Sequence, residues 1–181
     1  MTPRRALARI RDRLLRSEAG SATIEFVIGV PLILSLLFSS IDYGVVMLRQ
    51  VFLDRAVDIA VRQVRLGAVP ANGFNAFRAQ ICANTFMIAD CEDAIAIELR
   101  PIDTTTWAGL NTPAQCVNRA ADIEPTLQFT PSPGTQALML VRVCVAADPF
   151  ITMTGMIMGL SRDDTGDYLI VSKSAFANEP A

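Results

Sequence analysis

The sequence contains no histidine, and this absence excludes most common catalytic and metal-binding arrangements. Without an imidazole, the Ser/His and Cys/His pairs that activate nucleophiles cannot be built. The four cysteines include no CxxC pair, so neither a thiolate zinc site nor a CxxC redox centre is expected. A glycine-rich phosphate-binding loop is also lacking. We therefore expect a protein that is not an enzyme and that uses no metal and no cofactor.

Two remaining patterns with chemical potential have simpler interpretations. Lys173 stands between two serines, but the surrounding alternation indicates a strand, where a Ser/Lys dyad would need an unusual geometry. We interpret Lys173 as an exposed strand residue. Asp163, Asp164 and Asp167 surround a glycine without the spacing of an EF-hand, so they are interpreted as an acidic turn rather than a calcium site.

Charge is distributed unevenly, although the net charge of the chain is only −2. Residues 1–20 carry six arginines against Asp12 and Glu18, a net charge of +4, whereas residues 21–181 carry a net charge of −6. Basic residues flanking a membrane segment remain in the cytoplasm, so this asymmetry predicts a cytoplasmic leader over residues 1–20 and export of the remainder. The acidic exported part argues against a nucleic-acid partner.

An apolar run follows the leader, with Glu25 as its single charge. The 20 residues from 22 to 41 would cross about 30 Å of hydrocarbon at about 1.5 Å per residue. An ionised carboxylate inside lipid costs about 2.5 kcal/mol or more unless it finds a partner, so Glu25 is a functional candidate. The simpler interpretation puts Glu25 at the headgroups, neutral or solvated. Pro31 removes one backbone donor and predicts a kink or local loosening.

A cleaved secretory signal peptide is the competing interpretation of this N-terminus. Candidate cleavage sites after the run lack small residues at both recognition positions, and apolar character resumes over residues 45–48. We therefore expect the helix to be retained, with a transmembrane segment over residues 21–48.

Beyond Asp42 the pattern becomes amphipathic, which predicts an extension of the helix over residues 49–69 that packs on its own domain. Gly67 and Pro70 are expected to end a continuous helix that begins near residue 22. The expected packing stripe consists of the apolar residues at spacings of three and four, while charged residues such as Arg49 occupy other positions: Val45, Leu48, Phe52, Ala56, Ile59, Ala60 and Val64.

Residues 70–181 are expected to form one exported α+β domain. The patterns predict a helix over 74–86 and strands over 94–101, 137–145 and 167–175, with Pro101 ending the first strand. The predicted architecture is a long N-terminal helix, membrane half plus amphipathic half, packed against a small antiparallel β-sheet. The methionine-rich residues 150–160 are interpreted as core, with an adaptable contact surface as the alternative.

All four cysteines lie in the exported part: Cys82, Cys91, Cys116 and Cys144. An even number in an oxidising compartment indicates two disulfides, and four cysteines allow three connectivities. We favour Cys82 with Cys91, which closes a short helix-to-strand connection, and Cys116 with Cys144, which ties a long loop to the sheet.

The segment from Gly20 to Phe26, Gly-Ser-Ala-Thr-Ile-Glu-Phe, resembles the processing site of type IV prepilins. With Pro31-Leu-Ile-Leu, Asp42-Tyr-Gly, the stretch from 49 to 56 and the terminal Asn-Glu-Pro, it resembles the TadE-like family of tight-adherence (Tad) pilus proteins. The resemblance implies that a prepilin peptidase cuts between Gly20 and Ser21. Glu25 then becomes the fifth residue of the mature chain, with the usual aromatic residue of the Flp branch, Phe26, after it.

The resemblance further implies a pilin-like fold and a structural role, as a pseudopilin or minor pilin of a Tad/Flp-type pilus. The expected partners are the prepilin peptidase, other pilin-like subunits and the Tad assembly machinery. The expected location is the bacterial inner membrane with a periplasmic C-terminal domain, or the pilus and the exterior after processing. The alternative is an unprocessed, single-span anchored periplasmic binding or scaffold protein, which does not require the Gly20 and Glu25 pair.

Overall fold

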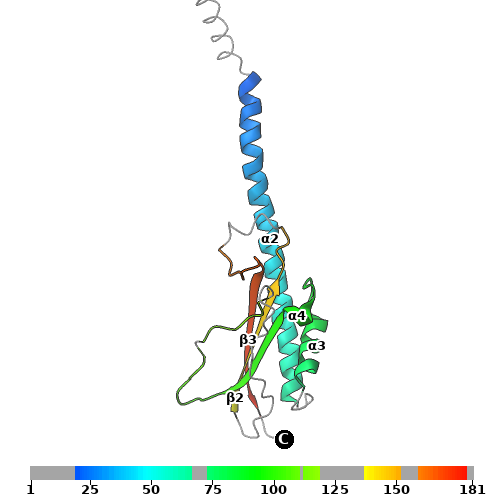
Figure 1. Ribbon diagram of the computed structural model, residues 1–181, viewed down its shortest axis with the longest axis vertical. Helices are drawn as coiled ribbons and strands as arrows, with labels where there is room; N and C mark the ends of the chain where they lie inside the picture. Colours follow the sequence, from blue (N-terminus) through cyan, green and yellow to red (C-terminus); the bar gives the residue numbers. More distant parts are fainter. Residues whose placement is uncertain (1–18, 67–72, 111, 119–136, 152–158, 179–181) are drawn as a thin grey trace, which may run out of the picture.

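The computed structural model describes residues 19–66, 73–110, 112–118, 137–151 and 159–178. Three strands form one antiparallel sheet in the order β1-β2-β3, and a long helix runs along it (Figure 1). This arrangement confirms the expected α+β class. The elements, in chain order, are α2 (Ala19–Arg65), α3 (Phe74–Asn84), α4 (Cys91–Ala94), β1 (Ile95–Ile102), β2 (Ala137–Ala147) and β3 (Tyr168–Asn178).

Helix α2 has two halves with different surroundings. It is 47 residues long, continues through Pro31 without interruption, and extends well beyond the sheet at its N-terminal end (Figure 1). No side chain from residue 22 to residue 38 is buried, although most of them are apolar. Among the helices that the structure describes, α2 alone is long and apolar enough to cross a membrane. Residues 22–38 therefore have the composition of a lipid-facing helix, and the described part of the structure buries none of their side chains.

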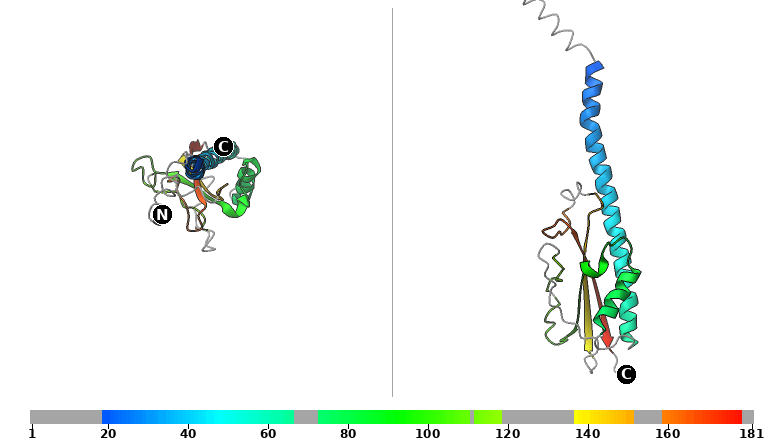
Figure 2. Two further views of the ribbon diagram at one scale, coloured as in Figure 1. Left: turned by 90° about the horizontal axis from the view of Figure 1, so that it is seen from above. Right: turned by 45° about the vertical axis from the view of Figure 1, so that its right-hand side comes forward.

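The C-terminal half of α2 packs against the sheet and α3. Leu53, Ala56 and Ala60 are fully buried and join one core with residues from one face of the sheet, Ile97 and Val143 among them. Helix α3 lies beside this half of α2 (Figure 2, right), and its residues Phe77 and Ile81 complete the core. The expectation that the amphipathic half of the helix packs on its own domain is thus confirmed.

The packing stripe itself is displaced from the predicted one. Leu48 is 53% exposed, whereas Arg49, which we expected on the other face, is buried. The buried apolar positions of the helix begin at Val46 and continue at Leu53 and Val57, so residue 49 lies on the same face one turn after Val46. The guanidinium is accommodated there because it donates a hydrogen bond to the backbone carbonyl of Asp148.

The predicted strand end at Pro101 is also wrong. β1 continues through Pro101 to Ile102, and Pro101 pairs with Met139 of β2. β1 is an edge strand, and a proline is tolerated there because its missing N–H can fall on the unpaired side. The three strands otherwise lie where the alternation predicts them, and no end is shifted by more than three residues. Residues 152–158 of the methionine-rich segment lie outside the described residues.

Leu53→Ala is expected to lower the free energy of unfolding by about 2–5 kcal/mol, because it opens a cavity at a side chain that has no solvent exposure. The matched control is Leu66→Ala, whose side chain is 74% exposed and whose expected effect is within about 0.5 kcal/mol. Urea unfolding of the full chain in detergent micelles, followed by circular dichroism, measures both. Equal midpoints for the two variants would contradict the packing of α2 against the sheet.

Candidate functional site

The residues expected at the processing and docking site lie at the start of α2. The backbone of Gly20 and Ser21 is helical, as part of an element that begins at Ala19. Glu25 is exposed, and within the described residues no hydrogen bond or ion pair reaches its carboxylate. Phe26 is 68% exposed. The chain therefore presents an acid and an aromatic ring on a bare helix, and the described part of its own domain supplies no partner for either.

A second polar site, which the sequence patterns did not reveal, lies where α2 meets the domain. Asp42 is 1% exposed, and among the described residues three donors bond to its carboxylate. The backbone N–H groups of Phe150 and Ile151 donate to Oδ1 at 3.0 and 3.2 Å, and the hydroxyl of Tyr168 donates to Oδ2 at 2.5 Å. A buried carboxylate is tolerated only when it is hydrogen-bonded in this way. Asp42 thus joins the helix to both ends of the β2–β3 connection.

Two arginines surround this carboxylate, and we call the group of Asp42, Arg49, Asp148, Arg162 and Tyr168 the junction cluster. Arg49 donates to the carbonyl of Asp148, and the guanidinium of Arg162 lies 4.5 Å from the centre of the Tyr168 ring. Burial lowers the pKa of Arg49, while Asp148 and Asp42 oppose this shift. Burial, with the hydrogen bond to Asp42, raises the pKa of Tyr168, so its hydroxyl stays protonated as a donor.

The junction cluster escaped prediction because its members are far apart in sequence. Asp42 and Tyr168 are separated by 126 residues, and Asp42 and Phe150 by 108. One signal was available in the sequence, since Asp42 is the charge that ends the apolar run and a charge at that place needs a partner. Nothing in the spacing identifies that partner.

The outer face of the sheet, opposite α2, is covered by the loop after β1. Arg142, in the middle of β2, is 2% exposed beneath this loop. Its Nη1 lies 3.2 Å from Glu98 Oε2 and donates to Thr112, and its Nη2 donates to the carbonyls of Gly109 and Leu110. These hydrogen bonds fix the loop against the strand.

Gly109 occupies the closest point of that contact. Its φ of +89° is one that side chains disfavour, and a Cβ atom there would lie 2.3 Å from Nη2 of Arg100, which donates to the Gly109 carbonyl. The loop therefore requires glycine at this position for both its backbone conformation and its approach to the arginine.

Two disulfides are present, Cys82–Cys91 and Cys116–Cys144, with Cα separations of 5.7 and 5.2 Å. The first connects the end of α3 to the start of α4. The second ties the loop that covers the outer face to β2, two residues after Arg142. These are the two pairs that the sequence favoured among three connectivities. No free cysteine is found among the residues that the structure describes.

The acidic turn before β3 is held together by Asp163. Its Oδ1 accepts hydrogen bonds from the backbone N–H groups of Thr165 and Asp167 and from the Thr165 hydroxyl. Partial burial raises the pKa of Asp163, but the hydrogen bonds from Thr165, Asp167 and Gly166 outweigh it and leave the pKa below its ordinary value. The turn is thus closed by its own backbone donors. In the described part of the chain, no three acidic, cysteine or histidine side chains gather as metal ligands would.

Asp163→Asn is expected to remove a pH dependence of stability. A carboxyl with a depressed pKa in the folded state stabilises the fold above its ordinary pKa of 3.8 and loses this effect as the pH falls through the folded-state value. The variant should therefore unfold at lower urea concentration than the wild type at pH 7, and the difference should shrink at acid pH. A difference that stays constant from pH 7 to below 3.8 would show that ionised Asp163 does not support the turn.

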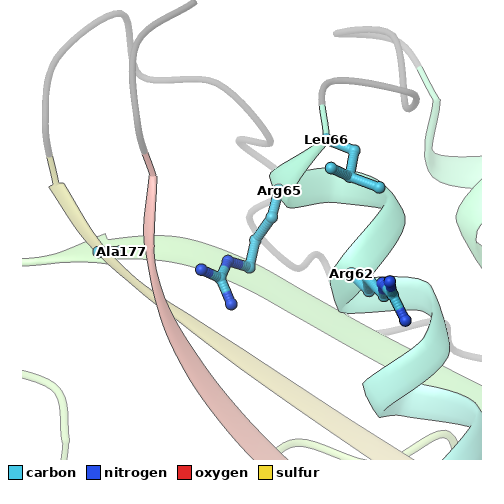
Figure 3. A pocket seen from close by; sticks show the side chains of 4 residues that line it. All are labelled: Arg62, Arg65, Leu66 and Ala177. Carbon is cyan, nitrogen blue, oxygen red and sulfur yellow. The ribbon is translucent and has the colours of Figure 1, made fainter.

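A shallow cavity of about 290 Å³ lies at the other end of the domain, where α2 and β3 end (Figure 3). Its lining consists of Arg62, Arg65, Leu66 and Ala177, and Arg65 reaches from the helix toward the end of β3. None of these four described lining residues carries an acid, thiol or hydroxyl that could act as a nucleophile or a general base. Lys173 is exposed on β3, as expected of a strand lysine.

Comparison with known families gives one match. Residues 20–62 match the family model described as TadE-like protein. The matched segment covers most of α2 and includes Gly20, Glu25, Asp42 and Arg49, whereas the sheet lies outside it. Comparisons with curated proteins and with solved structures gave no match. Over its long N-terminal helix, this chain is therefore similar to the TadE-like family.

Proposed function

We propose that this chain is a pilin-like structural protein, a pseudopilin or minor pilin of a Tad/Flp-type pilus, that is processed between Gly20 and Ser21. The observation that carries the proposal is the N-terminal half of α2. It is a bare apolar helix with one exposed acid, Glu25, and it lies within the segment that matches the TadE-like family. A folded domain that keeps such a helix uncovered has a surface suited to lipid or to the helices of other subunits.

Glu25 is assigned as the docking carboxylate. Cleavage after Gly20 creates a cationic amine on Ser21, four residues before Glu25. In an assembly, the amine of one subunit pairs with the Glu25 carboxylate of its neighbour and offsets the cost of placing both charges in an apolar environment. Because the acid has no partner in the described part of its own chain, this pairing favours the assembled state over the isolated subunit. Phe26, exposed beside it, adds apolar contact in the same helix bundle.

The proposed topology follows from charge and composition. The basic leader over residues 1–20 stays in the cytoplasm, residues 21–48 span the inner membrane, and the amphipathic residues 49–69 with the domain over residues 70–181 enter the periplasm. Pro31 lacks a backbone donor and provides a point at which the helix adjusts during packing. The two disulfides suit an oxidising compartment. The partners are the prepilin peptidase, other pilin-like subunits and the Tad machinery.

Gly20→Val tests the processing step. A branched side chain at the residue before the proposed cut should block cleavage, so the variant should keep its leader when it is co-expressed with the prepilin peptidase. Ala22→Val, two residues beyond the cut, is the matched control and should be processed. Immunoblotting for a shift in size separates the two. Loss of the leader from the Gly20 variant would show that cleavage does not depend on Gly20 and would contradict the proposed processing site. Retention of the leader by both variants would favour the alternative, an unprocessed single-span anchored periplasmic binding or scaffold protein.

A further inference from the structure

Phe150, near the start of the β2–β3 connection held by Asp42, lies at the level where the apolar run of α2 ends. Its backbone N–H donates to Asp42 Oδ1 at 3.0 Å. Residues 22–41, directly before Asp42, have the length of the hydrocarbon core, about 30 Å. When this run occupies the membrane, the hydrogen bond fixes Phe150 at the boundary between lipid and water.

The side chain of Phe150 is not part of the hydrophobic core of the domain. It is 57% exposed, although the backbone at this residue is tied to a buried carboxylate. Tyr43, the neighbour of Asp42 in the helix, is 43% exposed at the same level. Aromatic residues are enriched at the membrane interface, where their rings lie among the headgroups. Phe150 and Tyr43, from two separate parts of the fold, therefore both expose an aromatic ring near the end of the apolar run.

A buried position also lies on the membrane side of Asp42, within the apolar run. Ser39, about one helical turn toward the membrane, is only 4% exposed, whereas the adjacent Ser40 is exposed. One face of the helix is thus covered at a depth that belongs to the apolar run. On that face, the atoms that cover Ser39 would therefore lie at the depth of the bilayer when residues 22–41 occupy it.

The first charged residue of α2 after Asp42 lies on the side away from the membrane. Arg49 and its acceptor at Asp148 are about two helical turns beyond Asp42. Asp42, which holds Phe150, is itself buried, and Arg162 lies against the ring of Tyr168. From Phe150 to Ser161 the sequence contains no charged residue. Helix α2 therefore changes from apolar to charged along the membrane normal near Phe150, as a segment that crosses the interface does.

We propose that the start of the β2–β3 connection, at Phe150, inserts its ring into the membrane interface and gives the exported domain a second contact with lipid beside α2. This proposal rests on the proposed function only in requiring that α2 spans the membrane. The contact limits tilting of the domain relative to α2 while the subunit is in the membrane. It is lost when the subunit leaves the bilayer.

Fluorescence quenching by brominated lipids tests the contact. The chain has one tryptophan, Trp107, in the loop after β1. This loop starts at the membrane-distal end of the sheet, where Ile102, the last residue of β1, pairs with Leu138. In the Trp107→Phe background, Phe150→Trp places a single reporter at the proposed contact and keeps the backbone hydrogen bond to Asp42. Leu37→Trp in the same background reports on α2, and the unaltered chain reports on Trp107. All three full-length proteins are compared in nanodiscs with brominated or ordinary phospholipid chains.

The proposal predicts strong quenching of the reporter at 37, about twofold quenching at 150, and none at Trp107. Quenching at 37 without quenching at 150 would overturn the lipid contact and leave the pilin-like function intact. A blue-shifted emission at 150 that bromine does not quench would likewise overturn it, since the ring would then be covered by protein, such as a second copy. Absence of quenching at 37 would show that α2 does not span the membrane, which removes the basis of both proposals.

Discussion

Replacing Asp42 with alanine is expected to lower the free energy of unfolding by about 2–4 kcal/mol, a large loss for one side chain. The carboxylate is buried and accepts three hydrogen bonds, two from the backbone at residues 150 and 151 and one from Tyr168. Alanine leaves these donors without an acceptor in a site that excludes water, and it leaves Arg49 without one of its two nearby acidic groups. Urea unfolding of the full chain in micelles measures the loss.

Asp58→Ala is the matched control, because this aspartate lies in the same helix but is exposed. Its effect should be within about 0.5 kcal/mol. Tyr168→Phe removes one donor and keeps the ring, so it should fall between the two variants. If Asp42→Ala unfolds at the same urea concentration as Asp58→Ala, the junction cluster does not hold the β2–β3 connection to α2.

The second large effect is expected at Glu25 and concerns assembly rather than folding. Glu25→Ala should reduce incorporation into fibres by more than about tenfold, because it removes the counter-ion interaction between neighbouring subunits. A loss of about 1.4 kcal/mol in binding free energy already lowers the association constant tenfold. The unfolding midpoint should not change, because the carboxylate is exposed and has no partner in the described part of its own chain. Sheared fibres from cells that lack the native copy, analysed by immunoblotting, measure incorporation.

Val27→Ala is the control for Glu25→Ala, because Val27 is 62% exposed on the same bare half of α2. It removes a small apolar surface without removing charge, and it should be incorporated at close to the normal level. Glu25→Gln keeps the size of the side chain and isolates the role of the charge. Fibres that contain the Glu25→Ala protein in normal amounts would rule out the docking role of this carboxylate.

The sequence predicts the framework of this protein because its signals are local. The apolar run, the spacing of apolar residues at three and four, and the alternation around residues 137–145 each specify one element through its own period. Both disulfide pairs that the structure contains were favoured from the sequence, one because it closes a short helix-to-strand connection and the other because it ties a long loop to the sheet. The family resemblance could be seen because its residues lie within one helix.

The features that escaped prediction depend on contacts between distant segments. Arg49 was expected at the surface because it is charged, but the carbonyl at residue 148 makes its burial acceptable. Arg142 interrupts an apolar strand, and the sequence could not show that the loop carrying Gly109 covers it. Pro101 was expected to end a strand because proline has no N–H to donate. It is accepted within β1 because β1 is an edge strand, and that position is defined only by the complete sheet.

The N-terminal residue of the mature protein is the most direct measure of the central claim. The full chain would be expressed with and without its prepilin peptidase and studied by intact-mass spectrometry and N-terminal sequencing. We predict a chain that starts at Ser21 only when the peptidase is present, with the helix from Ala22 onward retained. A chain that keeps Met1 in both cases, or one that starts beyond residue 40, would contradict the pilin-like account and indicate a permanent anchor or an ordinary signal peptide.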